Sequence, residues 1–290
     1  MINGVFLLDK PKHITSNKAL YLVKKKVSPK KAGIVGILDP LASGMLPIVI
    51  NEGTKLAKYI ENKDKEYVAV AKLGYVSTTG DSEGIITSSK NITLNKLTNK
   101  DIEEVIEKFI GPQKQTPPMY SGLKINGIKL YKLARKGINV NRKSRDIYIY
   151  DLKIESINND EIIFRISCSK GTYIRTLIES IGKSLGVGAY TKDLRRIRVG
   201  TFIEKNMITL QDLTNIDECI IPLEKMVSDM TSITISSQEC QTLKYGQKVY
   251  TKLYKNIEEI VIKNENLNLI GVGTIINNYI HSKRLINFDE

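Results

Sequence analysis

The feature of this sequence that most constrains its fold is the order of its strand-like and helix-like segments. Apolar or alternating runs predict strands at residues 4–9, 67–73, 146–157 and 161–169. Helix-like stretches intervene at residues 17–27, 54–60, 100–110, 128–136 and 172–185. Because helices and long connections separate the strands, the strands must pair over large sequence distances. The order therefore predicts a mixed α+β fold.

The residues at the helix boundaries predict where the helices begin and end. Ser16, Asn99 and Thr172 stand just before helical stretches, and short polar side chains of this kind cap the first free amides of a helix. Gly111 follows the stretch that ends at residue 110 and is expected to stop it. An apolar stripe in the last helix predicts the face that packs against the sheet. Its members are Ile174, Leu177, Ile178, Ile181 and Leu185.

The sequence pattern changes after about residue 225. Short strand-like runs follow one another at residues 233–235, 257–262, 267–276 and 285–288, with glycines between them. This pattern predicts a small β-rich module over residues 226–290, after a larger body that covers residues 1–225. The alternative is that these strands extend the main sheet.

The chain carries a strong positive charge. Its 290 residues include 44 lysines and arginines against 31 acidic residues, which gives a formal net charge of +13. Two long segments contain no acid: residues 10–31, and residues 108–145, where Tyr120 and Tyr131 lie among the basic side chains. Basic residues interleaved with aromatic ones favour phosphate contact and base stacking, so the pattern predicts RNA or DNA binding. The alternative is charge that only keeps the chain soluble, or that reflects an AT-rich genome.

Several classes of protein are disfavoured by composition. No stretch approaches 18 uncharged apolar residues, and the N-terminus lacks the basic region and cleavage site of a secretory signal, so we expect a cytoplasmic protein without a membrane span. The three cysteines are far apart and there are only two histidines, His13 and His281. A metal site or a Ser-His triad is therefore not expected, and any chemistry must rest on Asp, Glu, Lys, Arg, Tyr or Ser.

Three residues stand out as candidates for chemistry. Asp39 lies between Leu38 and Pro40 in a segment with glycines at positions 33, 36 and 44, where the backbone can approach a substrate closely. A turn aspartate before proline is the structural alternative for Asp39. Arg175 is expected in the first turn of a helix, from which its planar fork could pair with a carboxylate or point to solvent. Tyr67 is an aromatic on a predicted strand, suited to base contact or to core packing.

Several blocks in this sequence resemble those of the bacterial TruB family of tRNA pseudouridine synthases. They occur in family order over residues 3–200, and together they are much more specific than any one alone. The blocks are NGVFLLDKP (3–11), GILDPLASGMLP (36–47), KEY (65–67), LG…TGD (73–81), QTPPMYSGLK (115–124), KLYKLARKG (129–137), CSKGTYIRT (168–176) and LRR (194–196).

The resemblance implies a fold and an activity. The fold would be the α+β pseudouridine-synthase fold, with a central and mostly antiparallel sheet and an RNA-binding insertion at about residues 120–145. Residues 226–290 would form a PUA-like RNA-binding module. The activity would be isomerisation of uridine-55 in the T-loop of tRNA, by cleavage of the C1′–N1 bond, rotation of the base and rejoining through C5. No group is lost and no redox change occurs, so no cofactor and no metal is expected.

The resemblance also assigns roles to residues of this chain. Asp39 would be the essential carboxylate, and it could attack C1′, attack C6 or remove the C2′ proton. Arg175 would form a salt bridge that orients Asp39 and keeps it ionised. Tyr67 would stack on the target base and is a possible general base. Leu194 would pack on the uracil from another side, and Tyr173 could pack against the base or against the core.

Three further residues are expected at or near the substrate. The resemblance places Asp81 in a loop near the pocket, as a polar substrate contact, and Lys10 in a role that supports the fold or the catalytic loop. Position 34 departs from the family pattern, because the segment reads Gly33-Ile34-Val35-Gly36 where the family usually has Gly-His-Thr-Gly. Ile34 cannot hydrogen-bond or stack, but it could occupy by bulk the space of a flipped base.

The expected partner is the T-loop and T-stem of tRNA, with the target uridine flipped out of the RNA. The resemblance implies a monomer with no obligatory protein partner. Two alternatives stay open: a non-catalytic factor that binds or folds tRNA, and the catalytic subunit of a guide-RNA-dependent synthase.

Overall fold

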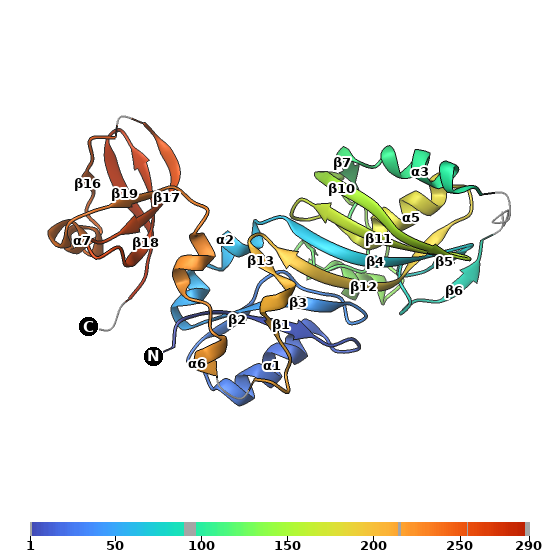
Figure 1. The fold of residues 1–290 in the computed structure, drawn as a ribbon, viewed down its shortest axis with the longest axis horizontal. Coiled ribbons are helices and arrows are strands. Elements are labelled where there is room, and N and C mark those ends of the chain that lie inside the picture. Colours follow the sequence, from blue (N-terminus) through green and yellow to red (C-terminus); the bar gives the residue numbers. More distant parts are fainter. Residues whose placement is uncertain (1, 90–96, 214–215, 254, 288–290) are drawn as a thin grey trace.

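A large sheet organises the main body of the protein, shown by a computed structural model that describes residues 2–89, 97–213, 216–253 and 255–287. Its strands run in the order β14-β1-β3-β12-β4-β11-β10-β7, with β2 paired to β3 and β13 to β12 (Figure 1). Within these described ranges, β1 pairs with β14 and β12 with β3 in parallel, and the other pairs in this sheet are antiparallel. The expected α+β fold with a mostly antiparallel central sheet is confirmed.

The strands of this sheet have the following bounds: β1 Gly4–Lys10, β2 Ala32–Ile34, β3 Ser43–Ile50, β4 Lys65–Leu73, β7 Gly111–Gln115, β10 Arg145–Asn158, β11 Glu161–Cys168, β12 Ala189–Val199, β13 Phe202–Ile203 and β14 Met207–Ile208. The four strands expected at residues 4–9, 67–73, 146–157 and 161–169 are present as β1, β4, β10 and β11. The sequence analysis missed β12, which lies in the middle of the sheet between β3 and β4. Its charged residues break the apolar alternation that marks a strand.

Helices cover the sheet and connect its strands. Helix α1 spans Ser16–Val27, α2 Ala57–Glu61, α3 Asn99–Glu107 and α5 Ile174–Ser184. The expected stripe on α5 is confirmed, because Ile174, Leu177, Ile178 and Ile181 are buried in the main core. No helix of the described residues is long and apolar enough to span a bilayer.

The expected helix caps were wrong by one position or more. The Thr15 side chain caps α1, and Thr98 caps α3 in a reciprocal pair with Asp101. The hydroxyl of Ser16 instead bonds to the backbone of Leu38, and that of Thr172 donates to the Ser169 carbonyl. These hydroxyls form hydrogen bonds with a distant segment or within a loop, and the local sequence does not reveal such contacts.

The insertion after β7 is a hairpin followed by a short helix. Strands β8 (Lys124–Ile125) and β9 (Ile128–Lys129) precede helix α4 (Leu130–Ala134), so the helix expected over residues 128–136 is shorter and begins later. Another small sheet pairs β5 (Tyr75–Ser77) with β6 (Ile86–Ser88).

The strands near the C-terminus form a separate five-stranded sheet in the order β15-β17-β18-β19-β16. Their bounds are β15 Ser232–Thr234, β16 Val249–Tyr250, β17 Ile257–Lys263, β18 Leu269–Ile276 and β19 Tyr279–Leu285, with helix α7 at Ser237–Lys244 (Figure 1). The alternative in which these strands extend the main sheet is excluded. The strand expected at residues 285–288 was wrong, since β19 ends at Leu285 and residue 288 lies outside the described residues.

The remaining short elements lie along the chain, and the last two of them, in residues 216–227, connect the two sheets. They are the 3-10 helices η1 (Asn51–Lys55), η3 (Glu204–Asn206) and η4 (Leu223–Val227), and helix α6 (Ile216–Cys219). A shared apolar cluster joins Val5 of β1 and Leu223 of η4 to Val261 and Leu269 of the C-terminal sheet. The C-terminal part therefore packs directly on the edge of the main body.

Gly44 allows two strands to approach closely beside the loop that carries Asp39. It is the second residue of β3 and has φ at 93°, and a Cβ there would lie 2.3 Å from the carbonyl oxygen of Arg196 in β12. We predict that Gly44→Ala lowers the free energy of unfolding by about 3 kcal/mol or more, through backbone strain and this clash. Chemical denaturation measures the change.

The matched control is Gly137→Ala, because Gly137 also has a positive φ but has no atom near the position of a Cβ. We expect this control to cost about 1–2 kcal/mol, from strain alone. Equal losses in the two variants would show that the approach of β3 to β12 does not require glycine.

Candidate active site

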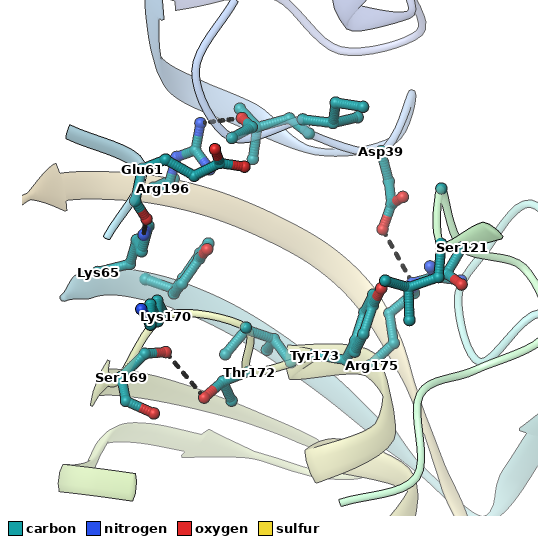
Figure 2. Close-up of a pocket in the computed structure, with 18 of the residues that line it drawn as sticks. Asp39, Glu61, Lys65, Ser121, Ser169, Lys170, Thr172, Tyr173, Arg175 and Arg196 are labelled. Carbon is teal, nitrogen blue, oxygen red and sulfur yellow. Dashed lines mark hydrogen bonds and ion pairs between the residues drawn. The ribbon is translucent and has the colours of Figure 1, made fainter. Parts of the chain in front are cut away.

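A pocket of about 580 Å³ opens where β4, β12, the start of α5 and the insertion meet the loop after β2. Figure 2 shows Asp39 and Arg175 facing one another on one side, with Arg196, Glu61 and Lys65 on the other. The chain thus brings together residues from distant parts of the sequence. Of the expected site residues, those that line the pocket are Asp39, Tyr67, Tyr173, Arg175 and Leu194.

The central contact of the pocket is an ion pair. Arg175 Nε lies 2.9 Å from Asp39 Oδ2, and Arg175 is almost fully buried while 35% of the Asp39 side chain stays exposed. Although the carboxylate faces the opening, the surrounding walls desolvate it and raise its pKa above the ordinary value. The charge of Arg175 and its hydrogen bond oppose this rise. The expected salt bridge is present.

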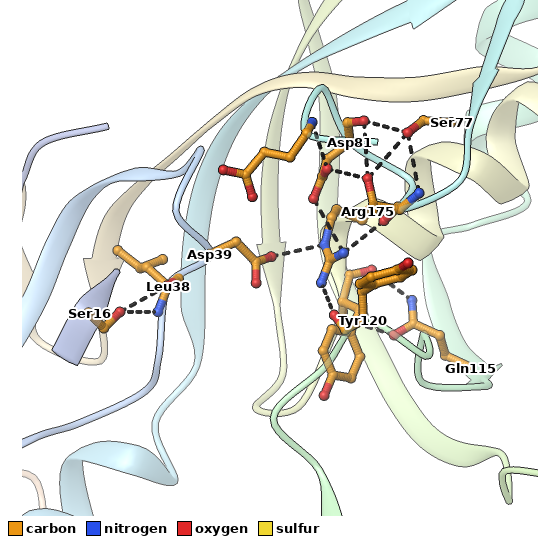
Figure 3. A network of polar contacts seen from close by, with 11 residues as sticks. Ser16, Leu38, Asp39, Ser77, Asp81, Gln115, Tyr120 and Arg175 are labelled. Carbon is orange, nitrogen blue, oxygen red and sulfur yellow. Dashed lines mark hydrogen bonds and ion pairs between the residues drawn. The ribbon is translucent and has the colours of Figure 1, made fainter. Parts of the chain in front are cut away.

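Arg175 is itself held from three sides (Figure 3). Its NH1 lies 3.3 Å from Asp81 Oδ2 and donates to the Thr79 carbonyl at 2.8 Å. Its NH2 donates to the Tyr120 carbonyl at 2.6 Å. Because each nitrogen of the fork has a partner, the guanidinium has one orientation, and that orientation presents Nε to Asp39.

Asp81 does not line the pocket but makes a polar contact beside it through Arg175, and the expected contact with substrate stays a prediction. Its side chain is buried, pairs with Arg175 and accepts hydrogen bonds from Thr79 Oγ1 and from the Glu83 amide. The carboxylate lies behind Arg175, where it balances the arginine charge and fixes the guanidinium. Its position in a turn was visible in the sequence, but the direction of its side chain was not.

Lys10 also lies away from the substrate space. It is fully buried, and its ammonium donates to the carbonyls of Pro11, Ile14 and Pro40 at 2.9, 2.8 and 3.3 Å. Burial lowers its pKa to about 8. Since Pro40 follows Asp39 directly, Lys10 supports the loop that carries the carboxylate, which agrees with the supporting role rather than with substrate binding.

Ile34 is not at the pocket. It pairs with Ile48 in the β2–β3 ladder and packs against the main apolar core. The exposed apolar side chain on this segment is Ile37, which is 63% exposed and lines the pocket two residues before Asp39. Strand pairing turns the Ile34 side chain toward the core, and the expectation that it occupies by bulk the space left by a flipped base stays a prediction.

Tyr173 is fixed at the start of α5 by a side chain that the sequence analysis did not assign to the site. The Gln115 amide donates to the Tyr173 carbonyl at 3.0 Å and accepts from its backbone amide at 2.8 Å. The Arg145 guanidinium lies 4.7 Å from the centre of the Tyr173 ring. Arg145 and Lys170 line the pocket as well and make it basic on this side. In the sequence, the acid-free segment that contains Arg145 indicated this basic side of the pocket.

Comparisons with known proteins agree on one family. The model of the TruB family pseudouridylate synthase N-terminal domain matches residues 24–174, and that of the tRNA pseudouridylate synthase B C-terminal domain matches residues 175–230. The chain belongs to the TruB family of pseudouridylate synthases. This membership confirms the resemblance seen in the sequence.

Relatives match over most of the chain. The tRNA pseudouridine synthase B of Coxiella burnetii is 42% identical over 295 residues, which cover 98% of this chain and 95% of that protein. The protein of the same name from Nitrosococcus oceani is 43% identical over 256 residues, with coverage of 86% and 82%.

Solved structures share the fold. The protein in a Cbf5-Nop10-Gar1 complex superposes with a TM-score of 0.74 at 26% identity, over 99% of this chain and 84% of that one. A chain from an H/ACA RNP bound to a substrate RNA gives a TM-score of 0.75 at 24% identity, over 99% and 86%. The shared fold therefore extends through the C-terminal part of this chain.

The contacts of Asp39 predict how its pKa responds to substitution. Arg175→Met removes the opposing charge and should raise the pKa of Asp39 further, whereas Asp81→Asn removes a like charge and should lower it. Carbon-13 NMR of aspartate-labelled protein measures both, with Asp39→Asn to assign the resonance. Shifts in the same direction in both variants would contradict this electrostatic arrangement.

Proposed function

We propose that this protein converts uridine-55 in the T-loop of tRNA to pseudouridine. The observation that carries the proposal is the buried Arg175 fork, which holds the Asp39 carboxylate at the pocket beside Tyr67 and Leu194. The matching relatives are named tRNA pseudouridine synthase B, which supports tRNA as the substrate.

The residues of the pocket supply what this isomerisation needs. Asp39 must be ionised to attack C1′ or C6 or to remove the C2′ proton, and Arg175 offsets the desolvation that favours the neutral acid. Tyr67 and Leu194 offer an aromatic and an aliphatic surface to the detached uracil while it rotates. The Tyr67 hydroxyl is a possible base for the C5 proton, which leaves after C5 joins C1′. One proton leaves C5 and another is taken up at N1, so the overall change is an isomerisation.

The target uridine has to leave the T-loop before it reaches Asp39. The basic insertion near residues 120–145 begins with Ser121, Gly122 and Leu123, which line the pocket. We assign to this insertion the role of a clamp on the RNA, whose phosphate contacts offset the few kcal/mol lost on unstacking. Residues 226–290 would act as a PUA-like RNA-binding module, and residues 1–225 as the catalytic domain.

Two other functions are less well supported. A non-catalytic tRNA-binding factor does not need an ion pair aimed into a pocket. A guide-RNA-dependent subunit is supported by the shared fold with the Cbf5-Nop10-Gar1 chain, but that identity is 26% against 42% for the Coxiella protein. We expect the chain to act on bare tRNA as a monomer without a protein partner or a cofactor.

Tritium release tests this function directly. Unmodified tRNA transcript labelled with tritium at uracil C5 should lose label to water, and Asp39→Asn should reduce the rate about 1,000-fold or more because no carboxylate remains. Replacing uridine-55 by cytidine in the transcript should abolish release by the wild type. Wild-type protein that binds the transcript without releasing tritium would point to the binding-factor function instead.

A further inference from the structure

Arg196 is a buried cation for which the proposed reaction gives no role. It lies in β12, lines the pocket and is only 2% exposed. Among the described residues no carboxylate forms an ion pair with it, in contrast to its neighbour Arg195, which pairs with Asp9 and Glu204. Burying a guanidinium without a counter-ion is costly unless its hydrogen bonds are satisfied, so its partners indicate what it does.

The first partners of Arg196 lie on either side of Asp39 in the chain, one in its loop and one within β3. The Arg196 Nε donates to the Met45 carbonyl at 2.8 Å, and its NH2 donates to the Gly36 carbonyl at 2.7 Å. One planar group therefore ties the loop to β3, in addition to the backbone bond from the Val35 amide to the Pro47 carbonyl at 2.9 Å.

The next partner is Tyr67. Arg196 and Tyr67 are opposite one another in the β12–β4 ladder, so their side chains emerge side by side on the same face. Burial raises the pKa of Tyr67, and the charge of Arg196 beside it opposes that rise. A guanidinium N–H can only donate, so Arg196 can support the Tyr67 hydroxyl only as a donor to its oxygen.

Lysine could not make this set of contacts. A guanidinium presents five donors in a rigid plane, whereas an ammonium on a flexible stem is a compact point charge. The contacts to Met45 and Gly36 use two different nitrogens of one plane, and the same side chain lies opposite Tyr67 in the ladder. The geometry thus accounts for an arginine that is buried without an acid.

We propose that Arg196 is a positioning residue of the synthase, which ties the Asp39 loop to β3 and holds the Tyr67 hydroxyl, so that the carboxylate and the phenol keep one position relative to each other. This inference rests on the proposed function for its kinetic consequence. Its structural part, the fixed loop, applies to the free protein as well.

Single-turnover pseudouridine formation with excess enzyme tests the kinetic part. Arg196→Lys should slow conversion about 100-fold, as expected for a misplaced reacting group, while the tRNA Kd stays within about 2-fold of wild type. The matched control is Arg195→Lys on the opposite face of the same strand, which should keep the wild-type rate. Thermal unfolding of each variant reports whether the fold is intact.

A double-variant cycle separates positioning from general destabilisation. Because Arg196 acts partly through the Tyr67 hydroxyl, Arg196→Lys combined with Tyr67→Phe should lose less rate than the product of the two single losses. If Arg196→Lys folds poorly, Gly36→Ala disturbs the same contact between Arg196 and the loop from the loop side, since the added Cβ would lie 3.2 Å from Arg196 NH1. It should show the same non-additivity with Tyr67→Phe.

Hydrogen exchange tests the fixed loop without any substrate. The Leu38 amide donates to Ser16 Oγ and the Ala42 amide to the Asp39 carbonyl, and both should exchange about 10-fold faster in Arg196→Lys or Gly36→Ala. Amides of β1 serve as the internal reference. Unchanged exchange of Leu38 and Ala42 overturns the proposal, even if the wild type proves inactive on tRNA. With an active wild type, a rate within 3-fold of it or strict additivity with Tyr67→Phe overturns the kinetic part.

Discussion

The structure of the site depends on the contact between the Arg175 guanidinium and two carboxylates. Asp39 meets its Nε from the pocket side, and Asp81 meets NH1 from the protein side. The nearby Asp81 carboxylate raises the pKa of Asp39, and the arginine between them lowers it. The backbone carbonyls of Thr79 and Tyr120 complete its hydrogen bonds and tie α5, the β5–β6 connection and the insertion to one point.

The loop that presents Asp39 is shaped by buried donors rather than by apolar packing alone. Ser16 forms hydrogen bonds with both backbone groups of Leu38. Lys10 donates to the Pro40 carbonyl, and Arg196 donates to one carbonyl in the loop and to one in β3. A loop has few hydrogen bonds of its own, so these side chains replace the ladder that a strand would have. Burying Lys10 and Arg196 costs free energy. The hydrogen bonds that these side chains make to the loop offset that cost, and they fix the position of the carboxylate.

Much of the fold and part of the site could be predicted from the sequence. Strands such as β4 and β11 alternate or are uniformly apolar, and the α5 stripe has helical spacing, so their local patterns are sufficient. Strand β12 was missed because Arg195 and Arg196 are stabilised by partners far away in sequence. The Asp39–Arg175 pair followed from the family resemblance, whereas composition and spacing alone left a turn aspartate and a surface arginine as alternatives. The roles of Asp81 and Ile34 could not be predicted, because each depends on the direction of a side chain that only tertiary packing decides.

The most direct test of this account is the pH dependence of single-turnover pseudouridine formation in wild type, Arg175→Lys and Arg175→Met. The reaction needs ionised Asp39, so the rate falls as pH falls through its pKa, and that pKa lies higher when no cation opposes desolvation. The account predicts that the acidic limb moves to higher pH in Arg175→Met and moves less in Arg175→Lys, which keeps the charge. A lower rate in Arg175→Met with an unmoved acidic limb would contradict the claim that Arg175 keeps Asp39 ionised.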